Sequence, residues 1–180
     1  IYKSIDVSFV EERFKTFVLE KFQMLSSILD SQSPVLVSHV MDFIASQADK
    51  IALIVMDGMS MFDFMVLKDS LRHVEYFENY IYAMIPTTTS ISRQCLLSGK
   101  FPIQLDNMFG LSREEHEFKN KCIGLGFKDR EIVYHRGYDV KVDIHTKIVA
   151  VIIDDIDNLV HSQRQGRIGM YHDVANLGKT

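Results

Sequence analysis

The stretch that decides the fold is Ile51-Ala52-Leu53-Ile54-Val55-Met56-Asp57-Gly58. Its six consecutive apolar residues predict a strand buried on both faces, as strands of parallel sheets are. A carboxylate directly after such a strand lies at the carboxyl edge of the sheet, where open α/β folds hold their ligands. Asp57 is therefore a candidate site residue, although Asp-Gly is also an ordinary turn dipeptide.

Two later segments repeat this design. A predicted strand at 80–85 leads into Pro86-Thr87-Thr88-Thr89-Ser90-Ile91-Ser92-Arg93, which opens a predicted helix at 90–98. A predicted strand at 147–153 leads into Asp154-Asp155-Ile156-Asp157-Asn158-Leu159-Val160-His161. Because parallel strands end at the same edge of a sheet, we expect the polar side chains of both segments to converge near Asp57.

Helical and extended patterns alternate along the rest of the chain. Helices are predicted at 7–30, at 33–46 with Ser33 and Pro34 at its start, at about 60–72, and at 112–122 with a Ser112/Glu115 capping box. A short strand is predicted at 132–134. This alternation predicts an α/β fold, a three-layer sandwich with a mostly parallel sheet. Residues 1–48 are interpreted as an N-terminal helical segment, which packs on the sheet or belongs to a preceding domain, and 49–180 as the α/β domain.

Composition excludes several classes of protein. The 180 residues are 47% hydrophobic and 24% charged, which is typical of a globular domain. The net charge of −4 does not favour direct binding to nucleic acid or to acidic membranes. No apolar run approaches the roughly 18 residues of a membrane helix. Two cysteines, Cys95 and Cys122, cannot form a disulfide framework, so a reducing, cytoplasmic location is expected.

The threonine run has two interpretations. A helix N-terminus offers free backbone N–H groups and a partial positive charge, which suit a phosphoryl oxygen. A hydroxyl at that place is either an N-cap or a nucleophile, and three threonines in a row do not by themselves show which one matters.

The acidic segment after the third strand suggests metal binding. Asp157 and His161 are four residues apart, so a helical turn would place both side chains on one face. Carboxylate and imidazole suit Zn²⁺ or Mn²⁺. Asp154 and Asp155 compete for the ligand role, and a polar loop with a solvent-facing histidine is the alternative.

The order of these motifs resembles the alkaline phosphatase superfamily, most closely its PglZ branch. The matching pieces are 55–59, 85–93, Leu96-Leu97-Ser98-Gly99-Lys100-Phe101-Pro102 and 157–161, within a region of about 50–165. The resemblance implies that Asp57 binds one metal ion, that Thr89 is the nucleophile and contacts the same ion, and that Asp157 and His161 bind a second ion. Two divalent ions, zinc or alternatively manganese, could lower the pKa of the hydroxyl and clamp the reacting oxygens.

The sequence departs from the family pattern beyond these motifs. The family also has an Asp-His pair after a later strand and one more histidine, and neither is found; His172-Asp173 has the reverse order. The fold is therefore expected to be truncated at its C-terminus, with about half the metal ligands, weak metal binding and little activity.

Two further residues, Arg93 and Asn107, are weaker candidates. Arg93, one turn beyond Thr89, could meet a substrate oxyanion or form a salt bridge on its helix. Asn107 could contact a phosphate, although its spacing differs from that of related enzymes. The run Glu114-Glu115-His116-Glu117 is interpreted as a solvated helix face.

The resemblance therefore implies a metal-dependent phosphohydrolase domain that cleaves a phosphate-containing substrate, a monoester or diester, in a bacterial phage-defence or signalling protein. The alternative is a catalytically inactive PglZ-type module that docks other defence proteins. A third interpretation is a plain α/β domain in which Asp57, Thr89 and His161 never meet.

Overall fold

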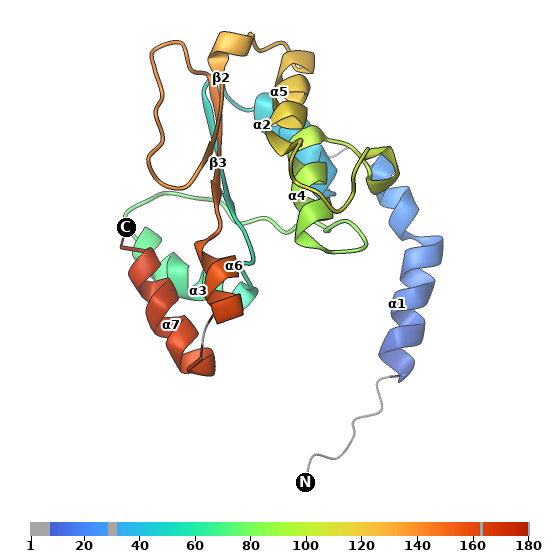
Figure 1. Ribbon diagram of the computed structural model, residues 1–180. Helices are drawn as coiled ribbons and strands as arrows, with labels where there is room; N and C mark the ends of the chain where they lie inside the picture. The colour runs from blue at the N-terminus through green and yellow to red at the C-terminus, as the bar shows by residue number, and fades with distance from the viewer. Residues whose placement is uncertain (1–7, 29–31, 163, 180) are drawn as a thin grey trace.

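A three-stranded parallel sheet forms the centre of the computed structural model, which describes residues 8–28, 32–162 and 164–179. The strands β1 (Ile51–Met56), β2 (Ile132–Arg136) and β3 (Ile148–Ile153) lie in the order β1-β3-β2. Both outer strands pair with β3 in parallel. All three run toward the end of the sheet where α6 begins (Figure 1). The predicted parallel α/β architecture is confirmed, and the strands predicted at 51–56, 132–134 and 147–153 all form.

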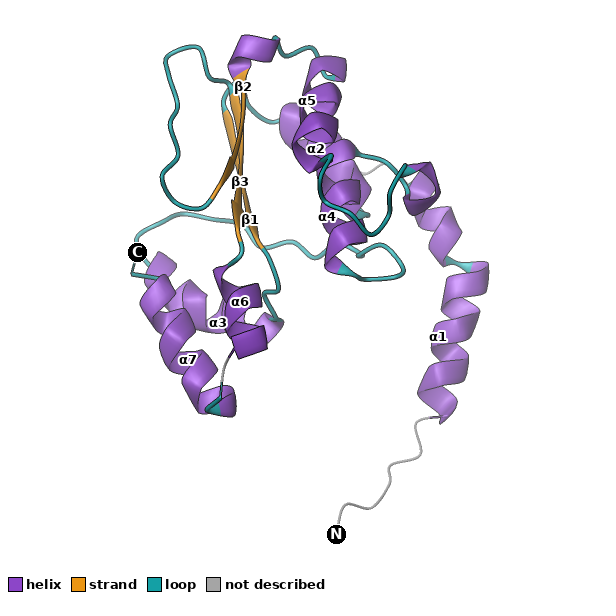
Figure 2. Ribbon diagram, viewed as in Figure 1, coloured by secondary structure: helices purple, strands orange, loops and turns teal. Residues whose placement is uncertain are grey.

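Three helices lie on one side of this sheet, namely α2 (Val40–Ala45), α4 (Thr89–Ser98) and α5 (Glu114–Gly124) (Figure 2). Their buried side chains form the main core with the inward face of the strands; the cluster contains Met41, Leu97, Phe118, Cys122, Ile132, Ile148, Ala150 and Ile152. Within each strand and helix, these apolar residues recur at the spacing that places them on one face of the element.

The opposite side of the sheet carries the long connection between β2 and β3, which arches beside the strands (Figure 2). Val140 of this connection packs against the cluster formed by Val149, Val151 and Ile153. Among the described residues a second helical layer over this face is not seen, so the three-layer sandwich stays a prediction. The expected burial of β1 on both faces is wrong for Ile54, which is 62% exposed. Its neighbours Leu53 and Val55 pack on the helix-covered core, so Ile54 points to the opposite face.

The carboxyl end of the sheet is flanked by α3 (Met61–Lys68), α6 (Asp155–Ser162) and α7 (Gly166–Leu177) (Figure 1). Helix α3 starts in a capping box between Ser60 and Asp63 and continues as a 3-10 turn to Leu71, which confirms the helix predicted at 60–72. Gly99 ends α4 in the left-handed conformation, with φ 69°, as its position predicts. Helix α7 was not predicted.

The predicted N-terminal helices are partly wrong. Helix α1 (Ser8–Glu20) is followed by a 3-10 helix (Phe22–Ser27), and 29–31 lie outside the described residues. No residue of α1 is buried, and α1 projects away from the sheet (Figure 1). In place of a helix from 33, Leu36 forms a parallel bridge with Tyr82, and α2 starts only at Val40.

Two other predictions are wrong because tertiary contacts override local pattern. The strand predicted at 80–85 is absent from this part of the described chain apart from the bridge at Tyr82; its Met84 is instead buried against Ile91 and Cys95 as an irregular segment. The Ser112/Glu115 capping box does not form, since α5 begins at Glu114 after Arg113 and has no side-chain cap. No described helix has the length and apolar character needed to cross a membrane.

Candidate functional site

Asp57 continues the end of β1, where its backbone N–H donates to the Ile153 carbonyl oxygen at 2.9 Å. The residue is buried, with 8% of its surface exposed. The next residue, Gly58, has φ 69°, and a Cβ atom built there would lie 2.8 Å from the Cα of Asp157. The chain after β1 therefore touches the first turn of α6, and this approach requires a glycine.

Helix α6 places Asp157 beside that turn. His161 lies one turn further along, and its Nε2 is 3.7 Å from Oδ1 of Asp157, on the same helix face. The two side chains differ in environment, since 34% of the Asp157 side chain and 78% of the His161 side chain are exposed. Asp157 thus lies next to the end of β1, whereas His161 extends into solvent.

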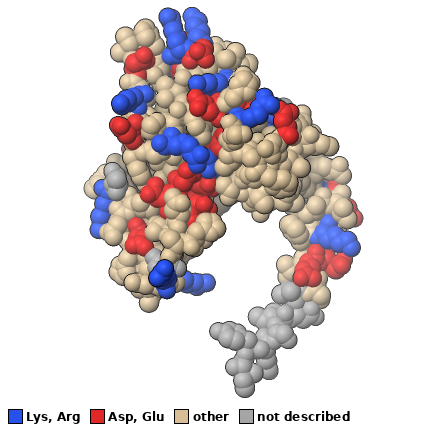
Figure 3. Space-filling model, in the orientation of Figure 1, with Lys and Arg blue, Asp and Glu red and all other residues tan. Residues whose placement is uncertain are grey.

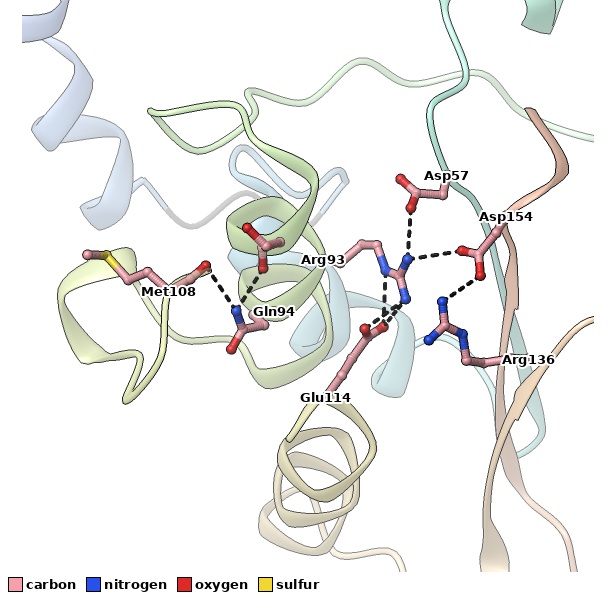
Figure 4. A network of polar contacts seen from close by, with 8 residues as sticks. Asp57, Arg93, Gln94, Met108, Glu114, Arg136 and Asp154 are labelled. Carbon is pink, nitrogen blue, oxygen red and sulfur yellow. Dashed lines mark hydrogen bonds and ion pairs between the residues drawn. The ribbon is translucent and has the colours of Figure 1, made fainter. Parts of the chain in front are cut away.

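Helix α4 contributes the threonines and Arg93. Thr88 is the N-cap without a side-chain cap bond, and Thr89 is the first helical residue and is exposed. Arg93 follows Thr89 by four residues and so lies on the same helix face. Its side chain is buried and reaches Asp57 (Figure 4). The N-terminal turn of α4 is thereby linked to the end of β1.

Every nitrogen of the Arg93 guanidinium donates to a carboxylate. Nη1 donates to Asp57 Oδ2 at 2.8 Å and to Asp154 Oδ1 at 3.0 Å. Nη2 donates to Glu114 Oε2 at 2.7 Å, and Nε to Glu114 Oε1 at 3.2 Å. Arg136 donates to the second oxygen of Asp154 at 2.5 Å (Figure 4). Arg93 therefore joins the ends of β1 and β3 to α5, and the predicted salt bridge within its own helix is not what forms.

Glu114 is a site residue that sequence reasoning missed. Its surface is 2% exposed, so the interpretation of 114–117 as a solvated face is wrong for Glu114, and also for the buried Glu117. Burial, together with the charge of Glu114 and a hydrogen bond to it, raises the pKa of Tyr134 to about 12. No local signal marks Glu114, because Glu115 and His116 beside it are exposed.

The neighbouring carboxylates explain why the Arg93 guanidinium stays charged although it is buried. Burial alone would lower the pKa of Arg93, but the hydrogen bonds to Asp57 and Glu114 outweigh burial and raise it, so the guanidinium stays charged. Acidic side chains gather near the carboxyl end of the sheet, with basic ones beside them (Figure 3). In the cluster itself the carboxylates of Asp57, Glu114 and Asp154 face the guanidinium groups of Arg93 and Arg136.

Asn107 lies in the loop between α4 and α5. Its carbonyl oxygen accepts from Gln94 Nε2 at 3.1 Å, and its side-chain Oδ1 accepts from the backbone N–H of Phe109 at 3.3 Å. Its side chain therefore closes its own turn. A phosphate contact by Asn107 stays a prediction.

The described residues do not fit the two-metal centre that the resemblance implies. Among them, no group of three or more His, Cys, Asp and Glu side chains is arranged to hold a metal ion. Asp57, the expected ligand of the first ion, is instead bound by Arg93. Asp157 and His161 offer two donors of a suitable kind but no third partner in this part of the chain. Two divalent ions at Asp57, Thr89, Asp157 and His161 remain a prediction.

These features define an α/β domain whose polar residues meet at the carboxyl edge of a parallel sheet. A family model for the BREX system PglZ alkaline phosphatase-like domain matches residues 35–173. The chain belongs to this family of PglZ alkaline phosphatase-like domains, which confirms the resemblance seen in its motifs. No curated protein matches the sequence.

Proposed function

We propose that this chain is a phosphoester-hydrolysing domain of a BREX defence system, in which Thr89 is the nucleophile. One observation supports the proposal: the segment after β1, the segment after β3 and helix α4 meet at one edge of the sheet. Gly58 touches Asp157, and Arg93 of the threonine helix binds Asp57. In open α/β sheets this edge is where ligands bind.

Thr89 has the position that such a role requires. It is exposed, it starts a ten-residue helix, and its hydroxyl makes no hydrogen bond with another described residue. The free N–H groups of the first helical turn could hold the oxygens of a phosphoryl group. In the reaction the Thr89 oxygen would bond to phosphorus as the leaving alcohol departs, and water would later cleave the phosphothreonine.

The test compares Thr89→Ala with Thr87→Ala in the 180-residue chain. Thr87 is a matched control because it is also an exposed threonine, two residues earlier. Bis-para-nitrophenyl phosphate reports diester cleavage, and phosphate release from monoesters is followed with malachite green, each with and without zinc or manganese. We expect Thr89→Ala to lower turnover at least about 100-fold and Thr87→Ala to change it little. Equal turnover by wild type and Thr89→Ala would show that Thr89 is not the nucleophile.

A second candidate is a PglZ-type module that docks other defence proteins and hydrolyses nothing. The ion pair between Arg93 and Asp57 favours it, since a carboxylate held by a buried guanidinium is not available to a substrate-bound cation. The same assay separates the two candidates. Absence of turnover by the wild type under every metal condition, with the chain folded by circular dichroism, would contradict hydrolysis by these 180 residues and favour the docking module.

A further inference from the structure

The cluster around Arg93 has a role that the nucleophile proposal does not use. We propose that Arg93 is a built-in counter-cation: its guanidinium holds the place beside Asp57 that a divalent cation would need, so a cation binds Asp57 only when Arg93 is displaced. This inference starts from the mismatch between the described residues and a two-metal centre. It does not depend on whether Thr89 is a nucleophile.

Arg93 Nη1 lies between two carboxylates, where a bound cation would lie. This one nitrogen lies 2.8 Å from Asp57 Oδ2 and 3.0 Å from Asp154 Oδ1. The two carboxylates follow the neighbouring strands β1 and β3, so Nη1 bridges the strand ends as a bound cation would. Only 5% of the Arg93 side chain and 9% of the Asp57 side chain are exposed. There is therefore little room for a hydrated ion beside Asp57 while the guanidinium stays.

Glu114 fixes the Arg93 guanidinium in this orientation. Both of its oxygens bind Arg93 from the opposite side, at 2.7 Å and 2.9 Å for Nη2. A planar guanidinium held by two parallel bonds has a defined direction, which a lysine ammonium would lack. The bond to Glu114 thus aims Nη1 at Asp57 and Asp154.

The charges of the cluster predict what happens when Arg93 is removed. Arg93 pairs with Asp57, Glu114 and Asp154; without it, Arg136 would still pair with Asp154, whereas Asp57 and Glu114 would lose the counter-charge of Arg93. Buried carboxylates without a counter-charge are strongly destabilising. A chain that lacks the Arg93 charge should therefore gain stability from a divalent cation bound by oxygen ligands, such as Mn²⁺.

The test is thermal unfolding of the 180-residue chain and of Arg93→Met, each in 1 mM Mn²⁺ or in sodium chloride of equal ionic strength. We expect the unfolding midpoint of Arg93→Met to lie about 6–20 °C below wild type. Mn²⁺ should recover about half of this loss, whereas sodium chloride should not, and the wild-type midpoint should move by less than about 1 °C. An Mn²⁺ shift as large in wild type as in the variant would overturn the proposal, and so would equal recovery by sodium chloride.

Two further variants show whether the effect arises at Asp57. Arg93→Met combined with Asp57→Asn removes one of the uncompensated charges, so we expect a partly restored midpoint and no response to Mn²⁺. Arg72→Met is the matched control, because Arg72 pairs with Asp69 on the surface with 72% of its side chain exposed. It should show neither the loss nor the response. A full Mn²⁺ response in the double variant would contradict a site at Asp57.

A measurement on the wild-type chain keeps the proposal testable if Arg93→Met fails to fold. The ¹⁵N NMR signal of Arg93 Nε, assigned by its loss in Arg93→Lys, is followed while Zn²⁺ is added to one equivalent. We expect this signal to keep its position, since the guanidinium is not displaced. A shift of the Arg93 signal that is abolished by Asp57→Asn would show that zinc reaches Asp57 readily, and the counter-cation role would be wrong.

Discussion

Glu114 and Arg93 are joined by a two-pronged ion pair, with Nη2 of the arginine 2.7 Å and 2.9 Å from the two carboxylate oxygens. The pair links α5 to α4 across 21 residues of sequence, and both side chains are buried. Because Arg93 also binds the residues that follow β1 and β3, this pair fixes the helix that begins at Thr89.

The first prediction concerns this pair. Glu114→Gln removes the charge that faces Arg93 while it keeps the size of the side chain, and we expect it to lower the free energy of unfolding by about 3 kcal/mol. Urea unfolding followed by circular dichroism measures the change. Glu115→Gln is the matched control, because Glu115 is exposed and pairs with Lys119 on the helix surface; it should cost less than about 0.5 kcal/mol. Equal effects at the two positions would contradict the importance of the buried pair.

A second prediction concerns the contact between Gly58 and Asp157. Gly58→Ala introduces a methyl group 2.8 Å from the Asp157 Cα at a residue with φ 69°, so we expect a loss of about 2–3 kcal/mol in unfolding free energy. Gly124→Ala provides the control, since a Cβ there meets no atom within 4 Å and the residue ends α5. That change should be neutral or stabilise the chain by up to about 1 kcal/mol. The close approach of β1 to α6 would be disproved by a Gly58→Ala chain as stable as wild type.

The two cysteines give a third prediction. Burial raises the pKa of the Cys95 thiol to about 11 and that of Cys122 to about 12. Since the thiolate is the reactive form, both should react with a thiol reagent at pH 8 at least about 100-fold more slowly in the folded chain than in urea. The rate of colour release from a disulfide dye measures this. Fast reaction of either cysteine in the folded chain would contradict its burial in the core.

A fourth prediction concerns pH and Glu131. The backbone N–H of Lys128 donates to this carboxylate at 2.9 Å, and Lys147 pairs with it at 2.9 Å; the two contacts lower the pKa of Glu131 below its ordinary 4.5. A carboxylate with a lowered folded pKa stabilises the chain above its unfolded pKa and loses this contribution as pH falls through the folded pKa.

The corresponding experiment compares unfolding midpoints of wild type and Glu131→Gln between pH 7 and pH 3. We expect wild type to have the higher midpoint at neutral pH, and the difference to shrink as pH falls below about 4.5. Asp129→Asn, on the same 3-10 turn, controls for a general change of charge. A midpoint difference that grows toward low pH would have the wrong sign for this account.

Much of the fold could be predicted because its signals are local. Residues 51–56 and 148–153 are uninterrupted apolar runs, and the glycine after Ser98 marks a helix end by its own backbone chemistry. The segment at 80–85 has the same apolar character as a strand, yet Met84 packs into a core cluster outside any sheet. Whether an apolar run finds a strand to pair with depends on the rest of the chain.

The candidate site was also predictable only in part, because its contacts join parts of the chain that are far apart in sequence. The ends of β1 and β3 lie at one edge because parallel strands must end together, which brings Asp57 and Asp157 into the same region. The partner of Asp57 could not be predicted, since Arg93 is 36 residues away in sequence and was expected to form a salt bridge on its own helix or to meet a substrate oxyanion.

The sequence by itself determined the parallel sheet, the helix that starts at Thr89 and the PglZ family, because hydrophobic runs, caps and ordered motifs are properties of neighbouring residues. Only the tertiary structure decided that Arg93 is enclosed by Asp57, Asp154 and Glu114. The physical reason is that burying a charge requires a counter-charge from another element, and residues far apart in the chain reveal such a pairing only once the chain has folded.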